Sequence, residues 1–383
     1  MREYDIAPSP IRRTQINSQR LNPSQNLEYQ QFSRRKNAII NGNFNTWQRG
    51  TSFTTATIPT ASQWSVDRDG AAEIATSRST DVPDNTLSNV VFNYSMLLDC
   101  TTADTSLLSN DQVFVQTRIE GFNWRQLALR PCTLSFWAKS TKIGIYSVSL
   151  VNSGLDQRIV KEYEIYITDT WEQKTLSFPA SPAAGTWDYT NGIGIYLSWM
   201  IMSGTNYLTS VLDTWQSGAF SSISFASSNQ VNGVDSTNNN FLITGVQFET
   251  GEVATDFEQI SIAQSLVDCQ RYFQKSYDAE TAPGTITSAG SLTGRANTAG
   301  QLGMTDFSLS RFSVVMRATP AVIWYSDVTG TASRVRDVSA AADRTVSSNN
   351  DEGTAGPGWP TLAVGITSAD TLYTAHYAAT AEL

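Results

Sequence analysis

Short runs in which apolar and polar residues alternate recur through much of the chain. A period of two sends successive side chains to opposite faces of a β-strand, so each run predicts a strand. Turn-forming residues separate most of the runs, and helical periodicity between them is sparse. The runs cover residues 89–98, 113–122, 133–138, 144–151, 162–168, 174–178, 192–200, 221–225 and 241–249. This pattern predicts a mainly β fold whose first domain is a jelly-roll β-sandwich.

The last of these runs is the most regular. Its alternation predicts one face with Phe241, Ile243, Gly245 and Gln247, and the opposite face with Leu242, Thr244, Val246 and Phe248. Gly251 interrupts the pattern. The strand is therefore expected to close the sandwich and to lead directly into a new element.

That new element is predicted to be a short helix. Ser261 and Gln264 have capping-box spacing, in which each side chain bonds to a free backbone N–H of the first turn. Four apolar residues follow at helical spacing: Ile262, Leu266, Cys269 and Phe273. This stripe either packs against its own chain or forms a seam between copies of the chain around an axis. The second alternative predicts an oligomer interface made by these four residues.

A smaller antiparallel β domain is predicted after the helix. Alternating runs at 307–316, 321–325, 361–367 and 372–378 predict its strands, and 347–360 reads as a loop. Residues 282–303 are dominated by small residues and form either a linker or small-residue strands. The predicted domains are an extended basic arm at 1–36, the jelly roll at 37–257, the hinge helix at 258–278 and the C-terminal β domain at 279–383.

The arm differs in charge from the rest of the chain. Seven basic residues oppose three acidic ones, a net charge of +4 in a chain of −9. It lacks apolar periodicity, so it is either a disordered tail or an arm that becomes ordered on a partner. The anchoring alternative assigns contacts to Arg12, Arg13, Arg34, Arg35 and Lys36. An acidic protein surface suits such an arm; without interleaved aromatic residues, nucleic acid is not expected.

The composition argues against several classes of site. Only 16% of the 383 residues are charged, and the chain contains one histidine, His376, which is predicted to be structural. A single histidine disfavours histidine metal sites and a Ser-His-Asp triad. Cys100, Cys132 and Cys269 lack metal-binding spacing and are predicted to be buried. No membrane span, signal peptide, metal or cofactor is predicted.

Catalytic chemistry is not expected from the acidic residues. A glycosidase would need a pair of carboxylates across the scissile bond. The candidates are Asp67 and Asp69, Asp99 and Asp104, and Glu249, Glu252, Asp256 and Glu258. All lie in turns or near the hinge, where carboxylates commonly cap backbone N–H groups. No phosphate-binding glycine loop is present, so the chain is predicted not to be an enzyme.

Aromatic residues in predicted loops offer a binding function instead. Exposed aromatic faces can stack on sugar rings, and nearby amides and carboxylates can bond to sugar hydroxyls. The candidate carbohydrate-binding residues are Trp187, Tyr189, Tyr207 and Trp215. The alternative for each of them is a place in the core or in a subunit interface.

Four segments resemble a group of bacteriophage tail-fibre and related virion proteins. The hinge reads QFETGEVATDFEQ and then DCQRYFQKSY, the first domain opens with INGNFNTWQRGTSF, and the last domain contains MRATP and ends with HYAATAEL. These segments occur in the expected order, and they leave residues 1–36 uncovered. The opening is also similar to that of carbohydrate-binding jelly-roll modules. By this analogy a calcium ion in the jelly roll is an open alternative, and the sequence does not identify its ligands.

The resemblance implies a structural component of a phage particle, most simply a tail fibre or spike. It implies a homotrimer whose arm attaches to tail, portal-adaptor or capsid proteins and whose β domains contribute to recognition of host-surface glycan. Such a protein would be assembled in the host cytoplasm and would reside in the virion. The alternatives are a fibre that decorates the head, a capsule-degrading glycosidase and a free carbohydrate-binding module.

Overall fold

The computed structural model describes residues 35–54, 58–218, 224–296, 311–350, 352–363 and 371–383. The chain divides into two units, Met1–Lys36 and Asn37–Leu383, and every helix and strand given below belongs to the second unit. The predicted strands at 221–225 and 307–316 fall partly outside the described residues.

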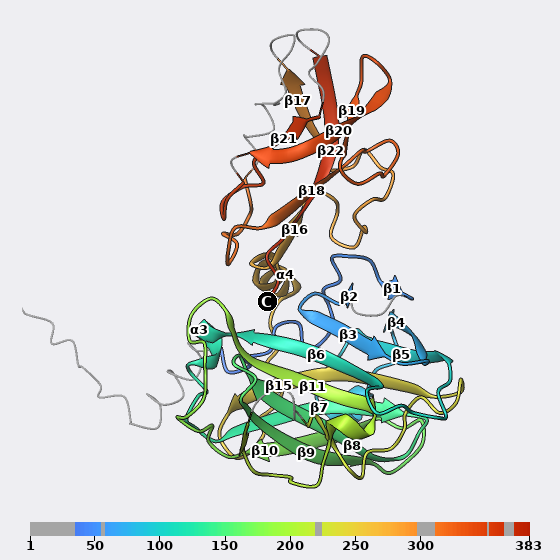
Figure 1. Cartoon of the computed structure of the whole chain (residues 1–383), viewed down its shortest axis with the longest axis vertical. Coiled ribbons are helices and arrows are strands. Elements are labelled where there is room, and N and C mark those ends of the chain that lie inside the picture. The colour runs from blue at the N-terminus through green and yellow to red at the C-terminus, as the bar shows by residue number, and fades with distance from the viewer. Residues whose placement is uncertain (1–34, 55–57, 219–223, 297–310, 351, 364–370) are drawn as a thin grey trace, which may run out of the picture. The chain divides into compact units, whose positions relative to one another are not determined.

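A sandwich of two antiparallel sheets forms the first part of this unit (Figure 1). Within the described ranges, one sheet has the order β1-β4-β5-β15-β7-β10 and the other β13-β9-β8-β11-β6-β3-β2. The first comprises β1 (Ser52–Phe53), β4 (Glu73–Ser79), β5 (Ser95–Thr102), β7 (Cys132–Ser140), β10 (Glu172–Phe178) and β15 (Asn240–Thr250). The second comprises β2 (Ile58–Pro59), β3 (Trp64–Asp69), β6 (Gln112–Glu120), β8 (Gly144–Asn152), β9 (Gln157–Ile165), β11 (Ile193–Ser203) and β13 (Gln216–Ser217). The mainly β fold is therefore confirmed.

Short elements complete the sandwich. They are α2 (Asn85–Ser88), α3 (Gly121–Trp124), the 3₁₀ turn η1 (Thr205–Tyr207), and the parallel pair β12 (Leu208–Thr209) and β14 (Ala226–Ser227). The strand predicted from residue 89 begins only at Ser95, because Asn89 instead ends α2 in a left-handed conformation. Asn is one of the few residues other than glycine that adopt this conformation readily.

The core between the two sheets is aromatic. The Trp199 ring on β11 lies 5.5 Å from that of Trp64 on β3 and meets Phe136 on β7 edge-on at 5.7 Å. All three side chains are buried. Aromatic pairs in such geometries stabilise a fold by more than the burial of their area alone accounts for. This cluster therefore stabilises the packing of the two sheets.

Strand β15 contains a β-bulge that the alternation did not predict. Its pairing with β7 shifts between Thr244 and Gln247, and Gly245 has φ of +62°. The extra residue reverses the two faces, so Ile243 and Val246 both enter the same core. The prediction of one continuous face through Gln247 is therefore wrong beyond Thr244.

The predicted helix is present as α4 (Ile262–Gln270). Ser261 Oγ caps it by accepting a hydrogen bond from Gln264 N at 3.1 Å, whereas the Gln264 side chain donates to Asp268 instead of to the cap. Phe273 lies beyond the helix, in β16 (Phe273–Lys275). The predicted four-residue helical stripe is wrong at this residue, because the chain leaves the helix at Arg271 to pair with the C-terminal strand.

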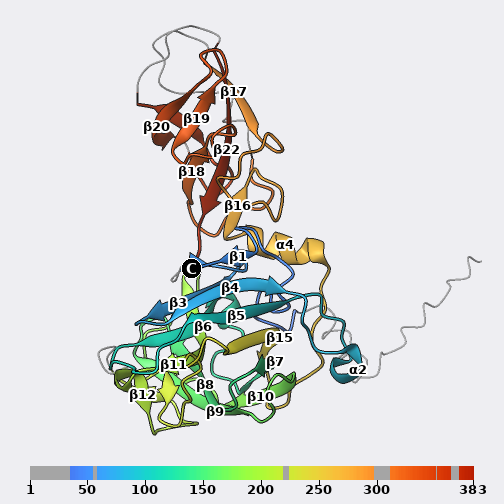
Figure 2. The same cartoon turned by 90° about the vertical axis from the view of Figure 1, so that its right-hand side faces the viewer.

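A third antiparallel sheet follows α4 (Figure 2). Its other strands are β17 (Leu292–Ala296), β18 (Ala321–Tyr325), β19 (Arg334–Asp337), β20 (Ala342–Asn350), β21 (Trp359–Leu362) and β22 (Thr371–Thr380). Strand β22 is central: β16 and β18 pair with its C-terminal half, and β17 and β19 pair with its N-terminal half. The predicted smaller antiparallel domain is thus confirmed.

Two predictions within this domain are wrong. The described residues 311–316 form no strand, because Phe312 N and Met316 N bond to Ala355 O and Thr354 O of a loop. Residues 347–360 are not simply a loop, since β20 runs to Asn350 and β21 starts at Trp359. Pro360, which lacks an N–H donor, is tolerated because β21 lies at the edge of its sheet.

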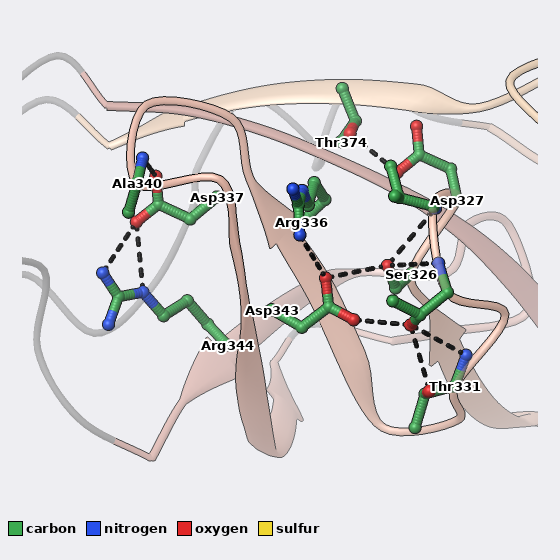
Figure 3. Close-up of polar contacts among 11 residues, drawn as sticks. Ser326, Asp327, Thr331, Arg336, Asp337, Ala340, Asp343, Arg344 and Thr374 are labelled. Carbon is green, nitrogen blue, oxygen red and sulfur yellow. Dashed lines mark hydrogen bonds and ion pairs between the residues drawn. The ribbon is translucent and has the colours of Figure 1, made fainter.

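The acidic side chains of this domain serve its internal structure (Figure 3). Asp343 accepts a hydrogen bond from Ser326 Oγ at 3.0 Å and faces Arg336 at 3.4 Å. Asp337 accepts from Arg344 Nη2 at 2.9 Å and from a backbone N–H of its own turn. These contacts join β19 and β20 to each other and to the turn after β18.

His376 is buried within the same sheet, as predicted for a structural residue. Its ring stacks on Tyr277 at 3.8 Å between centroids. Nε2 lies 2.9 Å from Thr287 O, which can only accept, so Nε2 carries the proton and Nδ1 accepts from Ser276 Oγ. Burial lowers the pKa of His376. The imidazole is therefore held neutral and is committed to packing.

The three cysteines are buried and form no disulfide among the described residues, which confirms their predicted role. Burial raises the pKa of Cys132 to about 12, and burial also raises the pKa of Cys100. A thiol with a raised pKa is a poor nucleophile and a poor metal ligand at neutral pH. These residues therefore act as small apolar packing groups.

Candidate functional site

Trp187 and Trp215, two of the predicted sugar-binding aromatics, lie together. Trp187 stacks on Trp124 with 5.4 Å between ring centroids, and Trp215 meets Trp187 edge-on at 5.8 Å. Their indole N–H groups donate to Ala184 O and Pro179 O. Both rings are half-buried against the sandwich core. The two tryptophans therefore pack mainly on protein.

The other two predicted aromatics are not part of this cluster. Tyr207 is half-buried, and its ring lies 5.9 Å from that of Phe225. Tyr189 is 36% exposed in the segment that precedes β11. The structure thus joins two of the four candidates into one cluster and places Tyr207 in another ring pair.

The predicted oligomer residues do not form one exposed stripe. Ile262 is 63% exposed and Leu266 is half-buried, whereas Cys269 and Phe273 are buried within the chain. On the buried side of α4, Ser265 Oγ bonds to Thr46 Oγ1 at 3.0 Å. Only the first turns of α4 present apolar side chains to solvent, and the homotrimer stays a prediction.

The predicted anchoring residues lie largely beyond the described ranges. Arg12, Arg13 and Arg34 are outside them. Arg35 and Lys36 are described, and both are exposed. The anchoring function of the arm stays a prediction.

A different set of side chains gathers on the outer face of the seven-stranded sheet. Strand register aligns them in two rows, and the name outer face is used here for these rows. The first row contains Arg118, Tyr196, Val151, Arg158 and Gln216; the second contains Ser65, Gln116, Ser198, Ser149 and Val160. Alternate residues of the same strands, including Ile119, Leu197, Leu150 and Ile159, point into the core.

The chain itself covers the next row of this sheet. The ring of Phe225 stacks on Phe114 of β6 with 6.4 Å between centroids. Ser227 N donates to Ser147 Oγ at 2.8 Å, and Asn229 Nδ2 donates to Glu162 at 2.9 Å. The segment after residue 224 therefore closes one side of the sheet and bounds the outer face.

The outer face holds polar atoms that lack partners. Among the described residues, Ser65 Oγ, Ser149 Oγ, Arg118 Nε and the Nε and Nη1 atoms of Arg158 are buried without a hydrogen bond. Buried polar groups in folded proteins nearly always have partners, and each exception calls for an explanation. Seven of the ten residues in the two rows are themselves buried, so only the half-buried Arg118, Tyr196 and Gln216 are open to a ligand.

Other groups on the face already have defined geometry. Gln116 Nε2 donates to Ser198 Oγ at 2.9 Å, which leaves the amide oxygen available as an acceptor. The Arg118 guanidinium carbon lies 5.7 Å from the centre of the half-buried Tyr196 ring. An aromatic ring among fixed donors and acceptors is an arrangement suited to a polyhydroxylated ligand.

Sequence reasoning missed this face. Its signal was the polar half of the alternating runs, such as Gln116 and Arg118 in one run and Ser198 in another. In the sequence alone, that half cannot be distinguished from the ordinary solvent side of a strand. The order of strands brings these runs together, and spacing along the sequence does not reveal that order.

One of the candidate catalytic acids is already engaged by the fold. Glu249 is buried, and its carboxylate accepts hydrogen bonds from Thr255 N and Oγ1 at 2.8 and 2.7 Å and from Gln247 Nε2. It therefore fastens the turn that follows β15. The described residues contain no group of three or more His, Cys, Asp or Glu side chains that could hold a metal ion. In the same ranges, no helix has the length and apolarity needed to cross a membrane.

The chain matches no protein-family model and none of the curated proteins. Solved structures similar to it include the enzymatically active domain of tailspike protein 4 from bacteriophage CBA120, at 15% identity and a TM-score of 0.30. That match covers 56% of this chain and 21% of the tailspike chain. A putative sugar-binding protein from Bacteroides thetaiotaomicron is 16% identical with a TM-score of 0.32, covering 56% of this chain and 100% of its own.

A family 11 carbohydrate-binding module from Clostridium thermocellum, in complex with a mixed-linked tetrasaccharide, is also similar. It is 10% identical, has a TM-score of 0.30, and is matched over 54% of this chain and 99% of its own.

Proposed function

We propose that the outer face binds a glycan and that the chain is a structural component of a phage particle. The observation that carries the binding proposal is the half-buried Tyr196 ring beside the half-buried Arg118 guanidinium on one face of the sheet. Sugar hydroxyls accept hydrogen bonds, so a glycan can supply acceptors to the Arg118 guanidinium. Tyr196 offers an aromatic surface within the same row.

The virion role is supported by the resemblance of four ordered segments to phage fibre proteins and by the basic arm. A tail fibre or spike would use the arm for attachment and the β domains for contact with the host surface. Binding without turnover is part of the proposal, and the hydrogen bonds that hold Glu249 in the turn after β15 support it for this one candidate acid.

Replacing Tyr196 with alanine is expected to weaken glycan binding by about 5–30-fold, which corresponds to about 1–2 kcal/mol. Isothermal titration against oligosaccharides selected on an array of bacterial glycans measures the effect. Tyr166→Ala removes a tyrosine that is 67% exposed outside the two rows and should leave affinity unchanged. Equal losses from both variants would place the binding site elsewhere, and a chain that binds no glycan on the array would refute the binding proposal.

Deleting residues 1–36 is expected to abolish incorporation of the chain into phage particles without changing its affinity for glycan. The deletion leaves the compact unit from Asn37 intact. Immunoblotting of purified particles, with the full-length chain as control, reports incorporation. Particles that carry the truncated chain at normal levels would show that the arm is not the anchor.

A further inference from the structure

Lys275 on β16 differs from the lysines of the sandwich. Lys139, Lys142, Lys161 and Lys174 each form an ion pair with an Asp or Glu side chain. Lys275 forms no ion pair with a described residue, and its Nζ donates to a backbone oxygen, that of Thr281. The Lys275 side chain is half-buried. The fold therefore holds a partly desolvated amine without a carboxylate bonded to it.

Apolar side chains border this amine. Strand register places Lys275 opposite Ala378 of β22, and Ile323 of β18 pairs with Ala378 from the other side. Phe273 lies two residues before Lys275, and side chains two apart on a strand share one face. Phe273 and Ala378 are buried. Such surroundings disfavour the charged form of an amine.

A second cation occupies the same face. The guanidinium carbon of Arg49 lies 3.7 Å from the centre of the Phe273 ring. Residues two apart on a strand are separated by about 7 Å, so Arg49 is close to Lys275 as well. Arg49 has its own acid, since its Nη2 lies 2.8 Å from Glu382 Oε1. Two positive charges on one face repel each other, and only that of Lys275 can be given up at neutral pH.

The charged groups around Lys275 act in opposite directions. Burial lowers the pKa of Lys275 to about 7, and the charge of Arg49 acts in the same direction. Asp278 and Glu280 oppose this change, but Glu280 is already bonded to Arg78 at 3.1 Å. An amine with this pKa is mostly neutral at pH 7.5, whereas an ordinary lysine is neutral in roughly one molecule in a thousand.

The other titratable groups on this side of the sheet carry no charge at that pH. Burial raises the pKa of Tyr277 and of Tyr325, so both phenols stay protonated. Burial lowers the pKa of His376, so its imidazole stays neutral. The balance of charge at Lys275 is therefore set by the residues named in the two preceding paragraphs.

From this geometry we propose that Lys275 is a modification site at which carbon dioxide adds to the amine and forms a carbamate. The lone pair of the neutral nitrogen forms a bond to the carbon of CO₂, and one π pair of CO₂ moves onto an oxygen. The nitrogen then releases a proton to water, so the step needs no oxidant or reductant. Lysine exchanges a positive charge for a negative one, which the nearby Arg49 favours. A small, uncharged reagent suits a half-buried amine among apolar side chains.

Trapping of the carbamate in the full chain tests the proposal. The protein is equilibrated with ¹³C-labelled bicarbonate and CO₂ at pH 7.5, treated with triethyloxonium to convert carbamates into stable ethyl esters, and mapped by peptide mass spectrometry. Labelling of Lys275 is expected to exceed that of Lys142 and of Lys161 at least tenfold, because acids hold those two amines in their charged forms. Equal labelling of the three lysines, or no label on Lys275, would overturn the proposal.

Variants assign the label and the contribution of Arg49. Lys275→Arg should remove the label from its peptide, and Lys161→Arg should leave it there. Arg49→Gln should lower labelling of Lys275 at least threefold, whereas Arg68→Gln, which removes an arginine paired with Glu73, should leave it unchanged. Full labelling in Arg49→Gln would overturn the role given to Arg49. Because the peptide map of the unmodified chain locates the label, the proposal stays testable even where a variant does not fold.

The pH dependence of acetylation provides a second readout that does not involve CO₂. Only the neutral amine attacks acetic anhydride, so the rate at Lys275 should rise as the pH increases through about 7 and then level off. Competitive labelling between pH 6 and pH 10, followed by peptide mapping, measures this midpoint. A midpoint above pH 9 would show that the amine keeps its proton at neutral pH, and would overturn the proposal.

Discussion

Replacing Glu120 with alanine is expected to lower the free energy of unfolding by about 2–4 kcal/mol. Glu120 ends β6 and is 2% exposed. Arg271 donates to its carboxylate from Nε at 2.8 Å and from Nη2 at 2.5 Å, and the Tyr272 hydroxyl donates to it at 2.6 Å. The hydrogen bond with Glu120 raises the pKa of Arg271. Alanine would leave a guanidinium and a buried phenol without their acceptor.

The expected loss of unfolding free energy depends on how far the Arg271 side chain is exposed to water. The Arg271 side chain is 34% exposed, so water recovers part of its lost interaction, and the expected cost is below that of breaking a fully buried pair. Chemical denaturation monitored by fluorescence measures the change. The matched variant is Glu73→Ala, which removes an ion pair with Arg68 at 2.9 Å whose carboxylate side is 45% exposed. Glu73→Ala should lower the free energy of unfolding by less than about 1 kcal/mol. Equal losses for Glu73→Ala and Glu120→Ala would contradict the stabilising role assigned to the buried Glu120.

Replacing Gly245 with alanine is expected to cost about 2–4 kcal/mol of unfolding free energy. Two effects add at this residue. Its φ of +62° is unfavourable for a residue with a Cβ atom, and a Cβ placed there would lie 2.7 Å from Phe92 Cζ and 3.1 Å from Trp137 Cδ1. The bulge of β15 depends on this backbone conformation, and the faces of the strand depend on the bulge.

Substitutions at two other glycines separate the cost of a positive φ from the cost of the steric clash. Gly251 also has positive φ, at +119°, but a Cβ there meets no atom within 4 Å, so Gly251→Ala should cost only about 1–2 kcal/mol. At Gly353 a Cβ meets nothing within 4 Å and φ is not in the left-handed region, so Gly353→Ala should change stability by less than about 0.5 kcal/mol. Denaturant unfolding of the three variants should rank them in this order, and a cost for Gly245→Ala no larger than that for Gly251→Ala would exclude the steric clash.

Strands with a core on one side could be predicted from the sequence, because burial of alternate residues leaves a period of two. The runs at 113–122 and 144–151 match β6 and β8 closely for this reason. The bulge at Gly245 could not be predicted, because one inserted residue changes the faces without changing the composition. The irregular path of 311–316 was missed because Phe312 and Met316 alternate like strand residues while their N–H groups bond to a loop.

Less of the candidate site than of the strands could be predicted from the sequence. Trp187 and Trp215 were singled out as loop aromatics, yet burial against the core engages much of their surface. The residues of the outer face come from strands whose neighbours in space are not neighbours in sequence, as when Arg158 of β9 and Arg118 of β6 fall in one row. An unpaired buried guanidinium is a property of the assembled sheet and leaves no mark along the chain.

Strands that pair with β22 cannot complete their pairing in a nascent chain until β22 has been synthesised. Among the described strands, β16, β17 and β18 each pair with β22 alone. Ser276, directly after β16, bonds to Tyr377, which is 101 residues farther along. At a synthesis rate of about 5–20 residues per second, a ribosome needs about 5–20 s to cover this distance. Throughout that interval these strands emerge with open edges that could join a neighbouring nascent chain, so chaperone protection is expected to matter at this stage of synthesis.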